Sequence, residues 1–185
     1  FKYMGEKAES LSGQGDERLI FAMEESNGCM AGDFLRDKDA AIGALLISQV
    51  ALECTIQKKT LWDRLEGIYR QWGYYLAKTM SLPMPGAEGY RRQQVILENL
   101  RKNWRQCLTA LNAVSIQDYL PGIDGLPPAN LLKVICGNGS WLAFRPSGTE
   151  EKLKVYVEAI GNSRDEAEEE LLRMEGIIAG LINQK

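Results

Sequence analysis

The sequence predicts an α/β segment over residues 1–78, followed by an α+β module over residues 79–185. In the first part, the short apolar run at residues 19–23 is typical of a buried strand, and two long stretches of helical periodicity follow it. In the second part, Gly137-Asn138-Gly139 separates two strand-like runs, which indicates a tight hairpin. Residues 152–158 then alternate between apolar and polar side chains, as a half-buried strand does. We therefore expect helices packed on a mixed sheet, and then an antiparallel sheet with two helices.

The first part contains two expected helices after its opening helical turn, polar loop and strand. One helix spans about 40–57, with Asp37 or Asp39 as its N-cap. Because this helix is apolar on nearly every side, we expect it to be well buried. The next helix begins at Thr60, which forms a short variant of the capping box with Asp63, and Gly73 ends it.

The second part alternates between strands and helices. A strand begins near Tyr74, and Pro83-Met84-Pro85-Gly86 interrupts the pattern before a helix over about 88–107. The final helix begins with a second capping box, formed by Ser163 and Glu166. Four strands are expected between these helices, over residues 115–120, 131–136, 140–145 and 152–158.

Composition excludes several classes of protein. Apolar content of 45% and charged content of 25% are those of a soluble globular protein. The net charge of −3 argues against nucleic acid as the main partner, and no run reaches the ~18 apolar residues of a membrane span. Four widely spaced cysteines and the absence of histidine exclude the common zinc patterns and give no disulfide framework. We expect reduced thiols, no metal site and no membrane partner, in a cytoplasmic protein.

The turn before the strand at 152–158 has the components of a phosphate-binding loop. Arg145 offers a planar fork of donors that can meet two phosphate oxygens. Ser147 and Thr149 add hydroxyl donors, and Gly148 lets the backbone approach a ligand closely. Lys154 adds a further positive charge if the loop opens onto its face of the strand. The plain alternatives are an ordinary turn with an exposed arginine and an edge strand guarded by lysines.

A second polar cluster, Glu24-Glu25-Ser26, follows the first strand at its carboxyl end, where ligands bind in open α/β sheets. A carboxylate beside Ser26 suits hydrogen bonding to sugar hydroxyls. Two neighbouring carboxylates also suggest a glycosidase, but adjacent residues on an extended segment point to opposite faces and make a poor acid–base pair. A polar loop after a strand remains the plain interpretation, as a helix cap with solvated charges does for residues 36–39.

Four segments together resemble one family, the α-D-phosphohexomutases, in which they occur in the same order. The chain is most similar to the bacterial phosphoglucomutase/phosphopentomutase type, and the resemblance covers essentially its whole length. It implies the end of the third domain and the whole fourth domain of a four-domain enzyme, the fourth being a small TBP-like module. We therefore expect a C-terminal fragment. The matching segments are residues 1–7, 23–28, 32–39 and 145–150.

The resemblance implies an enzyme that interconverts 1-phospho and 6-phospho (or 5-phospho) sugars through a phosphoserine and a bisphosphate intermediate. The catalytic serine loop and the magnesium loop of the family are absent from these residues. We expect both loops upstream, with Mg²⁺ and an activator of the glucose 1,6-bisphosphate type, neither bound by this fragment. Expected partners are a phosphosugar and the N-terminal domains of the same protein. The alternative is a non-catalytic phosphosugar-binding or interaction module.

The resemblance also assigns roles to individual residues. Glu24 and Ser26 would contact the sugar, and Lys38 matches a basic residue near the reacting group that is a candidate for proton transfer. Lys2 matches a lysine at the start of a cleft-facing segment. The phosphate-binding residues would be Arg145, Ser147, Gly148, Thr149 and Lys154.

Three departures from the family pattern affect these expectations. Ala22-Met23 precede the glutamates where glycine is usual, and Asn27 stands where an aromatic residue is common, which leaves the sugar preference open. Glu151 replaces the usual proline after Thr149-Glu150 and adds negative charge beside the phosphate loop.

Overall fold

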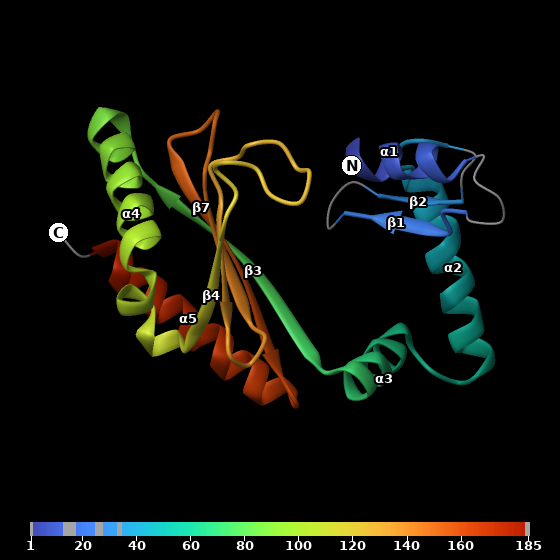
Figure 1. The fold of residues 1–185 in the computed structure, drawn as a ribbon. Helices are drawn as coiled ribbons and strands as arrows, with labels where there is room; N and C mark the ends of the chain where they lie inside the picture. The colour runs from blue at the N-terminus through green and yellow to red at the C-terminus, as the bar shows by residue number, and fades with distance from the viewer. Residues whose placement is uncertain (1, 13–17, 25–27, 33–34, 184–185) are drawn as a thin grey trace. The chain divides into compact units, whose positions relative to one another are not determined.

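The computed structural model describes residues 2–12, 18–24, 28–32 and 35–183. Contacts between residues divide the chain into two compact units, residues 1–67 and 68–185, which are described separately (Figure 1). This division falls before the boundary expected at residue 78, because the strand that begins at Tyr74 belongs wholly to the sheet of the second unit.

The first unit combines helices with a small sheet. It contains α1 (Lys2–Leu11), β1 (Phe21–Met23), β2 (Cys29–Ala31) and α2 (Ala40–Ile56). β1 and β2 pair in antiparallel fashion, with Phe21 opposite Ala31, and α2 contacts β2. The mixed sheet expected here therefore differs from the antiparallel pair that the described residues form. Asp39 caps α2, since its Oδ1 accepts the N–H of Ala41 at 2.8 Å, which confirms one of the two predicted caps.

Burial in this unit differs from the prediction. We expected α2 to be buried nearly all round, but Cys54 is its only fully buried side chain, and Leu52 and Ile56 are 62% and 74% exposed. The strand expected at residues 19–23 forms at Phe21–Met23, yet Ile20 and Phe21 are also exposed. The apolar pattern indicates that these side chains favour burial. The other described residues of this unit do not cover them.

α3 (Leu61–Trp72) has both of its predicted ends. The N–H of Asp63 donates to Thr60 Oγ1 at 3.0 Å, and the N–H of Thr60 donates to Asp63 Oδ2 at 2.7 Å, so the capping box is confirmed. Gly73 ends the helix in the left-handed region, with φ +99°. Among the described helices none is by itself long and apolar enough to span a membrane, and α2 and α3 meet that test only as a pair bent by 92°.

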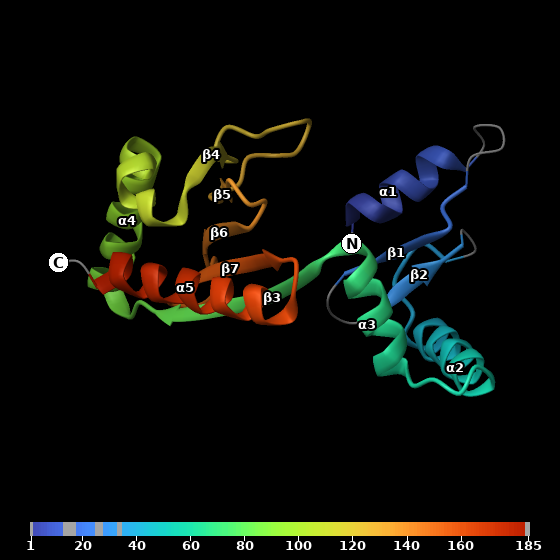
Figure 2. The same cartoon turned by 90° about the horizontal axis from the view of Figure 1, so that it is seen from below.

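The second unit is an antiparallel sheet with two long helices on one face, as Figures 1 and 2 show. The strand order is β3-β7-β6-β5-β4, and this confirms the α+β class. The helices are α4 (Gly86–Cys107) and α5 (Arg164–Asn183), with a short 3₁₀ helix η1 (Thr109–Leu111) between α4 and β4. The strands are β3 (Tyr74–Pro83), β4 (Ala113–Asp118), β5 (Leu132–Cys136), β6 (Trp141–Pro146) and β7 (Lys152–Gly161).

The alternation of β7 separates the core from the open face of the sheet. Leu153, Val155 and Val157 are buried in the core between the sheet and its helices. Lys154 and Tyr156 lie on the opposite face, since successive side chains of a strand alternate. Because β7 is hydrogen-bonded to β3 on one side and to β6 on the other, the alternative of a lysine-guarded edge strand is wrong.

The predicted hairpin of this unit forms. The predicted capping box forms in part, because Glu166 Oε2 accepts the N–H of Asn162 rather than that of Ser163. Gly137-Asn138-Gly139 joins β5 to β6, and Gly139 has φ +87°. At the start of α5, Ser163 Oγ accepts the N–H of Glu166 at 3.2 Å. All four cysteines are free thiols and three of them are buried, as predicted from their spacing.

Candidate functional site

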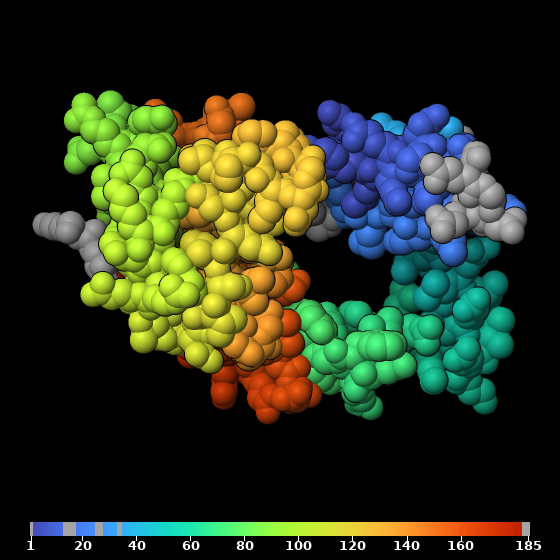
Figure 3. Space-filling model, in the orientation of Figure 1, coloured from blue at the N-terminus to red at the C-terminus, as the bar shows by residue number. Residues whose placement is uncertain are grey.

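The loop between β6 and β7 is a compact turn at one end of the sheet, at the exposed orange tip in Figure 3. The N–H of Ser147 donates to the carbonyl of Lys152 at 2.9 Å, and the N–H of Lys152 donates to the carbonyl of Glu150 at 2.8 Å. Ser147 Oγ accepts the N–H of Glu150 at 3.2 Å. These internal bonds fix the turn without help from distant side chains.

Strand register places two cations beside this loop. Arg145 of β6 is directly opposite Lys154 of β7, so both side chains leave the sheet on the same face. They line one pocket of about 290 Å³, together with Tyr156, with Pro146 at the end of β6 and with three loop residues: Ser147, Gly148 and Thr149. The structure therefore brings together all five residues that the sequence suggested for a phosphate.

Sequence reasoning missed Tyr156. It lies two residues after Lys154 on the same face of β7, opposite the small side chain of Ala143. The alternation of β7 that places Lys154 on the open face of the sheet also places Tyr156 there. We did not include Tyr156 because the phosphate-loop motif ends at residue 150.

The carboxylate of Glu150 partly neutralises the positive charge of the pocket. Glu150 Oε1 accepts a hydrogen bond from Lys152 Nζ at 2.9 Å, and Glu150 Oε2 lies 3.6 Å from Lys154 Nζ. The hydrogen bond from Lys152, and then the charges of both lysines, hold the pKa of Glu150 below its ordinary value. Within the described part of the chain, no carboxylate pairs with Arg145. An anion in the pocket would thus meet Arg145 directly and compete with Glu150 for Lys154.

The backbone conformation of the loop does not require a glycine at Gly148. Its φ lies outside the left-handed region, and a Cβ built there would meet no atom within 4 Å. The absence of a side chain instead leaves open space on the wall of the pocket.

In the first unit, Glu24 and Lys38 form an ion pair that the sequence did not predict. Glu24 Oε2 lies 2.7 Å from Lys38 Nζ, and both side chains are largely shielded from solvent. The hydrogen bond from Lys38 is the largest of several effects that lower the pKa of Glu24 to about 2. Glu24 is therefore an ionised acceptor at neutral pH, and it is paired with Lys38.

The other predicted residues of the first unit are Ser26 and Lys2. Ser26 lies outside the described residues, as does Glu25 of the glycosidase alternative. Lys2 lies on the exposed side of α1, with its Nζ 3.6 Å from Glu6 Oε1.

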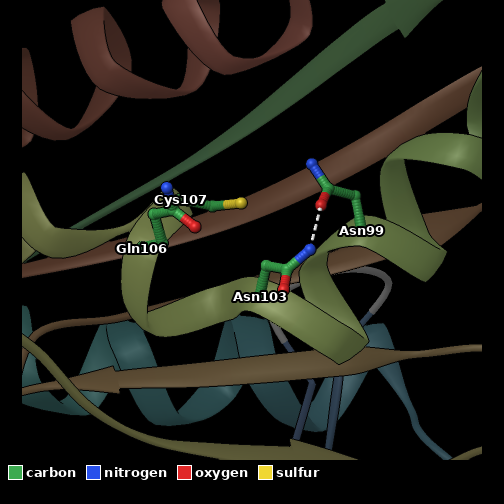
Figure 4. A pocket seen from close by; sticks show the side chains of 4 residues that line it. All are labelled: Asn99, Asn103, Gln106 and Cys107. Carbon is green, nitrogen blue, oxygen red and sulfur yellow. Dashed lines mark hydrogen bonds between the residues drawn. The ribbon is translucent and has the colours of Figure 1, made fainter.

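The described residues offer no cluster for a metal ion, since no three His, Cys, Asp or Glu side chains among them come together. A further pocket of about 350 Å³ lies at the kink of α4, where Asn103 has the non-helical dihedrals φ −128° and ψ 23°. Figure 4 shows its lining of Asn99, Asn103, Gln106 and Cys107, in which Asn103 Nδ2 donates to Asn99 Oδ1 at 2.8 Å. Without a charged side chain, this lining does not suit an anion.

Comparison with known proteins places this site in context. Residues 93–175 match the family model described as phosphoglucomutase/phosphomannomutase, C-terminal domain. The phosphoglucomutase of Staphylococcus haemolyticus (strain JCSC1435) is 34% identical over 168 residues, covering 85% of this chain and 30% of that protein. The phosphoglucomutase of Staphylococcus aureus (strain MRSA252) is 35% identical over 169 residues, with the same two shares. The chain thus spans about 30% of the length of these relatives.

Among solved structures, the open form of the exocytosis-sensitive phosphoprotein pp63/parafusin from Paramecium, described as a phosphoglucomutase, has the same fold. The TM-score is 0.68 at 18% sequence identity, over 89% of this chain and 30% of that one.

Proposed function

We propose that this chain, whose residues 93–175 match the model of the phosphoglucomutase/phosphomannomutase C-terminal domain, is the phosphosugar-holding part of a phosphohexomutase. The observation that carries the proposal is the pocket in which Arg145 and Lys154 face a loop of hydroxyl and backbone donors. Such an enzyme is an intramolecular phosphotransferase acting on 1-phospho and 6-phospho sugars, or on the corresponding pentose phosphates.

We assign the pocket to the phosphate that is not being transferred. Arg145 would bind two phosphate oxygens, while Ser147, Thr149 and the N–H groups near Gly148 bind the others. Each hydrogen bond to a charged oxygen contributes about 1.5–3 kcal/mol, so a few of them hold the ester firmly. Phosphoryl transfer depends on positioning and on charge neutralisation, and a fixed phosphate anchor supplies the positioning.

We assign sugar recognition to the first unit. The ionised carboxylate of Glu24 accepts hydrogen bonds from hydroxyl groups in either orientation of the substrate, and Ser26 is its proposed companion. Lys38 keeps this carboxylate charged through their 2.7 Å contact. A role for Lys38 in proton transfer requires that this pair open when the substrate binds.

The transferring serine and the Mg²⁺ that neutralises the transferring phosphoryl group are assigned to another part of the protein. The described residues of this chain hold, orient and desolvate one end of the substrate. The N-terminal domains of the same cytoplasmic protein are the proposed partner.

Isothermal titration with glucose 1-phosphate, ribose 1-phosphate and inorganic phosphate tests the anchor. Arg145→Ala should weaken the binding of all three by about tenfold or more, since a charged hydrogen-bonding group is lost. Lys102→Ala, the same charge change at an exposed position of α4, should leave the affinity unchanged. Equal affinity in both variants would refute the anchor.

Mutase assays on the complete reading frame test the enzyme assignment. Turnover that Arg145→Ala reduces supports it. A complete protein that binds phosphosugars without turning them over would be the non-catalytic module instead.

A further inference from the structure

A third pocket, of about 260 Å³, is lined by the β6–β7 loop and by the N-terminal part of α4. Its lining combines an aromatic ring, an amide, hydroxyl groups and two carboxylates. The lining residues are Met84, Gly86, Tyr90, Gln93, Ser147, Gly148, Thr149, Glu150 and Glu151.

Gln93 is the unexplained residue of this pocket. It lies on the core-facing side of α4, in line with Gly89, Leu97 and Leu100, and only 4% of its surface is exposed. No group in the described part of the chain hydrogen-bonds its side-chain amide, which lines the pocket. The amide atoms of Gln93 are not fully enclosed, because they open onto the pocket, so they are available to a hydrogen-bonding partner from outside the chain.

The adjoining helix end offers further donors. Pro85 is the N-cap of α4 and makes no side-chain capping bond. The N–H of Gly89 donates to the carbonyl of Pro85 at 3.1 Å as the first bond of the helix, so the N–H groups of residues 86–88 precede the helical ladder. A Cβ on Gly89 would collide with the backbone of Met84, and this close approach brings the entry segment against the helix.

The charges of the lining decide the class of ligand. Glu150 and Glu151 both line the pocket, and no cation does, so a phosphate or carboxylate would be repelled. Glu150 is already occupied by Lys152, whereas Glu151 is an exposed acceptor. Adjacent hydroxyl groups of a ligand would find an amide that both donates and accepts and a carboxylate that accepts. The exposed ring of Tyr90 suits the apolar face of the same ligand.

We propose that this pocket binds an uncharged polyol, such as a sugar ring. Gln93 and Glu151 bond neighbouring hydroxyls, and the ring of Tyr90 packs against the C–H face. Three loop residues, Ser147, Gly148 and Thr149, line both this pocket and the phosphate pocket. The polyol site is carried by Tyr90, Gln93 and Glu151, none of which lines the phosphate pocket.

The test is an NMR titration of the full chain with D-glucose, following the side-chain amide of Gln93 and the backbone amides of residues 86–88. The expected result is a saturable shift of these signals, with a dissociation constant on the order of millimolar. Gln93→Leu keeps a similar volume without hydrogen-bonding groups, and should weaken glucose binding by about tenfold or more. Its melting temperature should change little, because no hydrogen bond within the described part of the chain is lost.

Arg145→Ala separates the two pockets: it should keep glucose binding while losing inorganic phosphate. Absence of saturable shifts at residues 86–93, or identical titrations of Gln93→Leu and the unsubstituted chain, would overturn the polyol site. Inorganic phosphate competing with glucose at these same amides would overturn it too. Failure of the phosphate arm alone would overturn the proposed function and leave the polyol site standing.

Discussion

Removal of one negative charge from the tip of the β6–β7 hairpin should strengthen phosphate binding. In Glu150→Gln, the loss of charge releases Lys154, whose Nζ lies 3.6 Å from Glu150 Oε2, and Lys152, whose Nζ lies 2.9 Å from Oε1. The ammonium group of Lys154, which lines the pocket, then becomes available to an anion there.

The size of the gain follows from the distance to Lys154. Two opposite unit charges about 3.6 Å apart in bulk-water dielectric attract with an energy equivalent to about sevenfold in a binding constant. Because the side chains are exposed and screened by salt, we expect about a two- to threefold gain in affinity.

Calorimetric titration with inorganic phosphate, at low and at physiological ionic strength, measures this gain. It should shrink as salt is added. Glu98→Gln, the same change at an exposed position of α4, is the control and should have no effect. Weaker phosphate binding in Glu150→Gln would refute the reasoning, because it would mean that Glu150 orders the loop more than it neutralises the lysines.

Two further predictions concern the ion pair of the first unit and the loop glycine. The Glu24 carboxyl, followed by NMR, should titrate near pH 2, and Lys38→Met should move its midpoint toward the ordinary value of 4.5. Since the pKa of Glu24 is depressed in the folded state, the stabilisation by this pair is present above about pH 4.5 and is lost as pH falls toward 2. A midpoint that does not move in Lys38→Met would exclude Lys38 as the cause of the depressed pKa. Gly148→Ala should keep the melting temperature, because its Cβ meets no atom within 4 Å, but should weaken phosphate binding in calorimetry by filling the space that the ligand approaches. A large fall in melting temperature with unchanged affinity would show that the glycine serves the fold instead.

The sequence predicted the features of this structure that depend on neighbouring residues. The caps at Asp39 and Thr60, the helix end at Gly73 and the alternation of β7 each depend on a few neighbouring residues, and each is present. Such motifs carry their own hydrogen-bonding partners, so nothing distant has to be known.

Features that depend on distant residues were beyond local patterns. An alternating strand has the same sequence pattern at the edge and in the interior of a sheet. Only the pairing with β3 shows that β7 is an interior strand. Likewise, the pairing of Glu24 with Lys38 and the burial of Gln93 depend on how separate segments meet. The apolar character of α2 predicted burial, but it could not say which part of a protein supplies the cover.

The ladder between β3 and β7 determines where a shortened protein can start. Tyr74 is opposite Gly161 and Pro83 is opposite Lys152, so β3 accompanies β7 along its full length. An expression product trimmed to begin at residue 79 would lose half of that ladder and leave backbone N–H and C=O groups of β7 open to strands of other molecules. Starting ahead of Tyr74 keeps the backbone groups of β7 paired with β3 along the whole strand, and β3 stays the edge of the sheet.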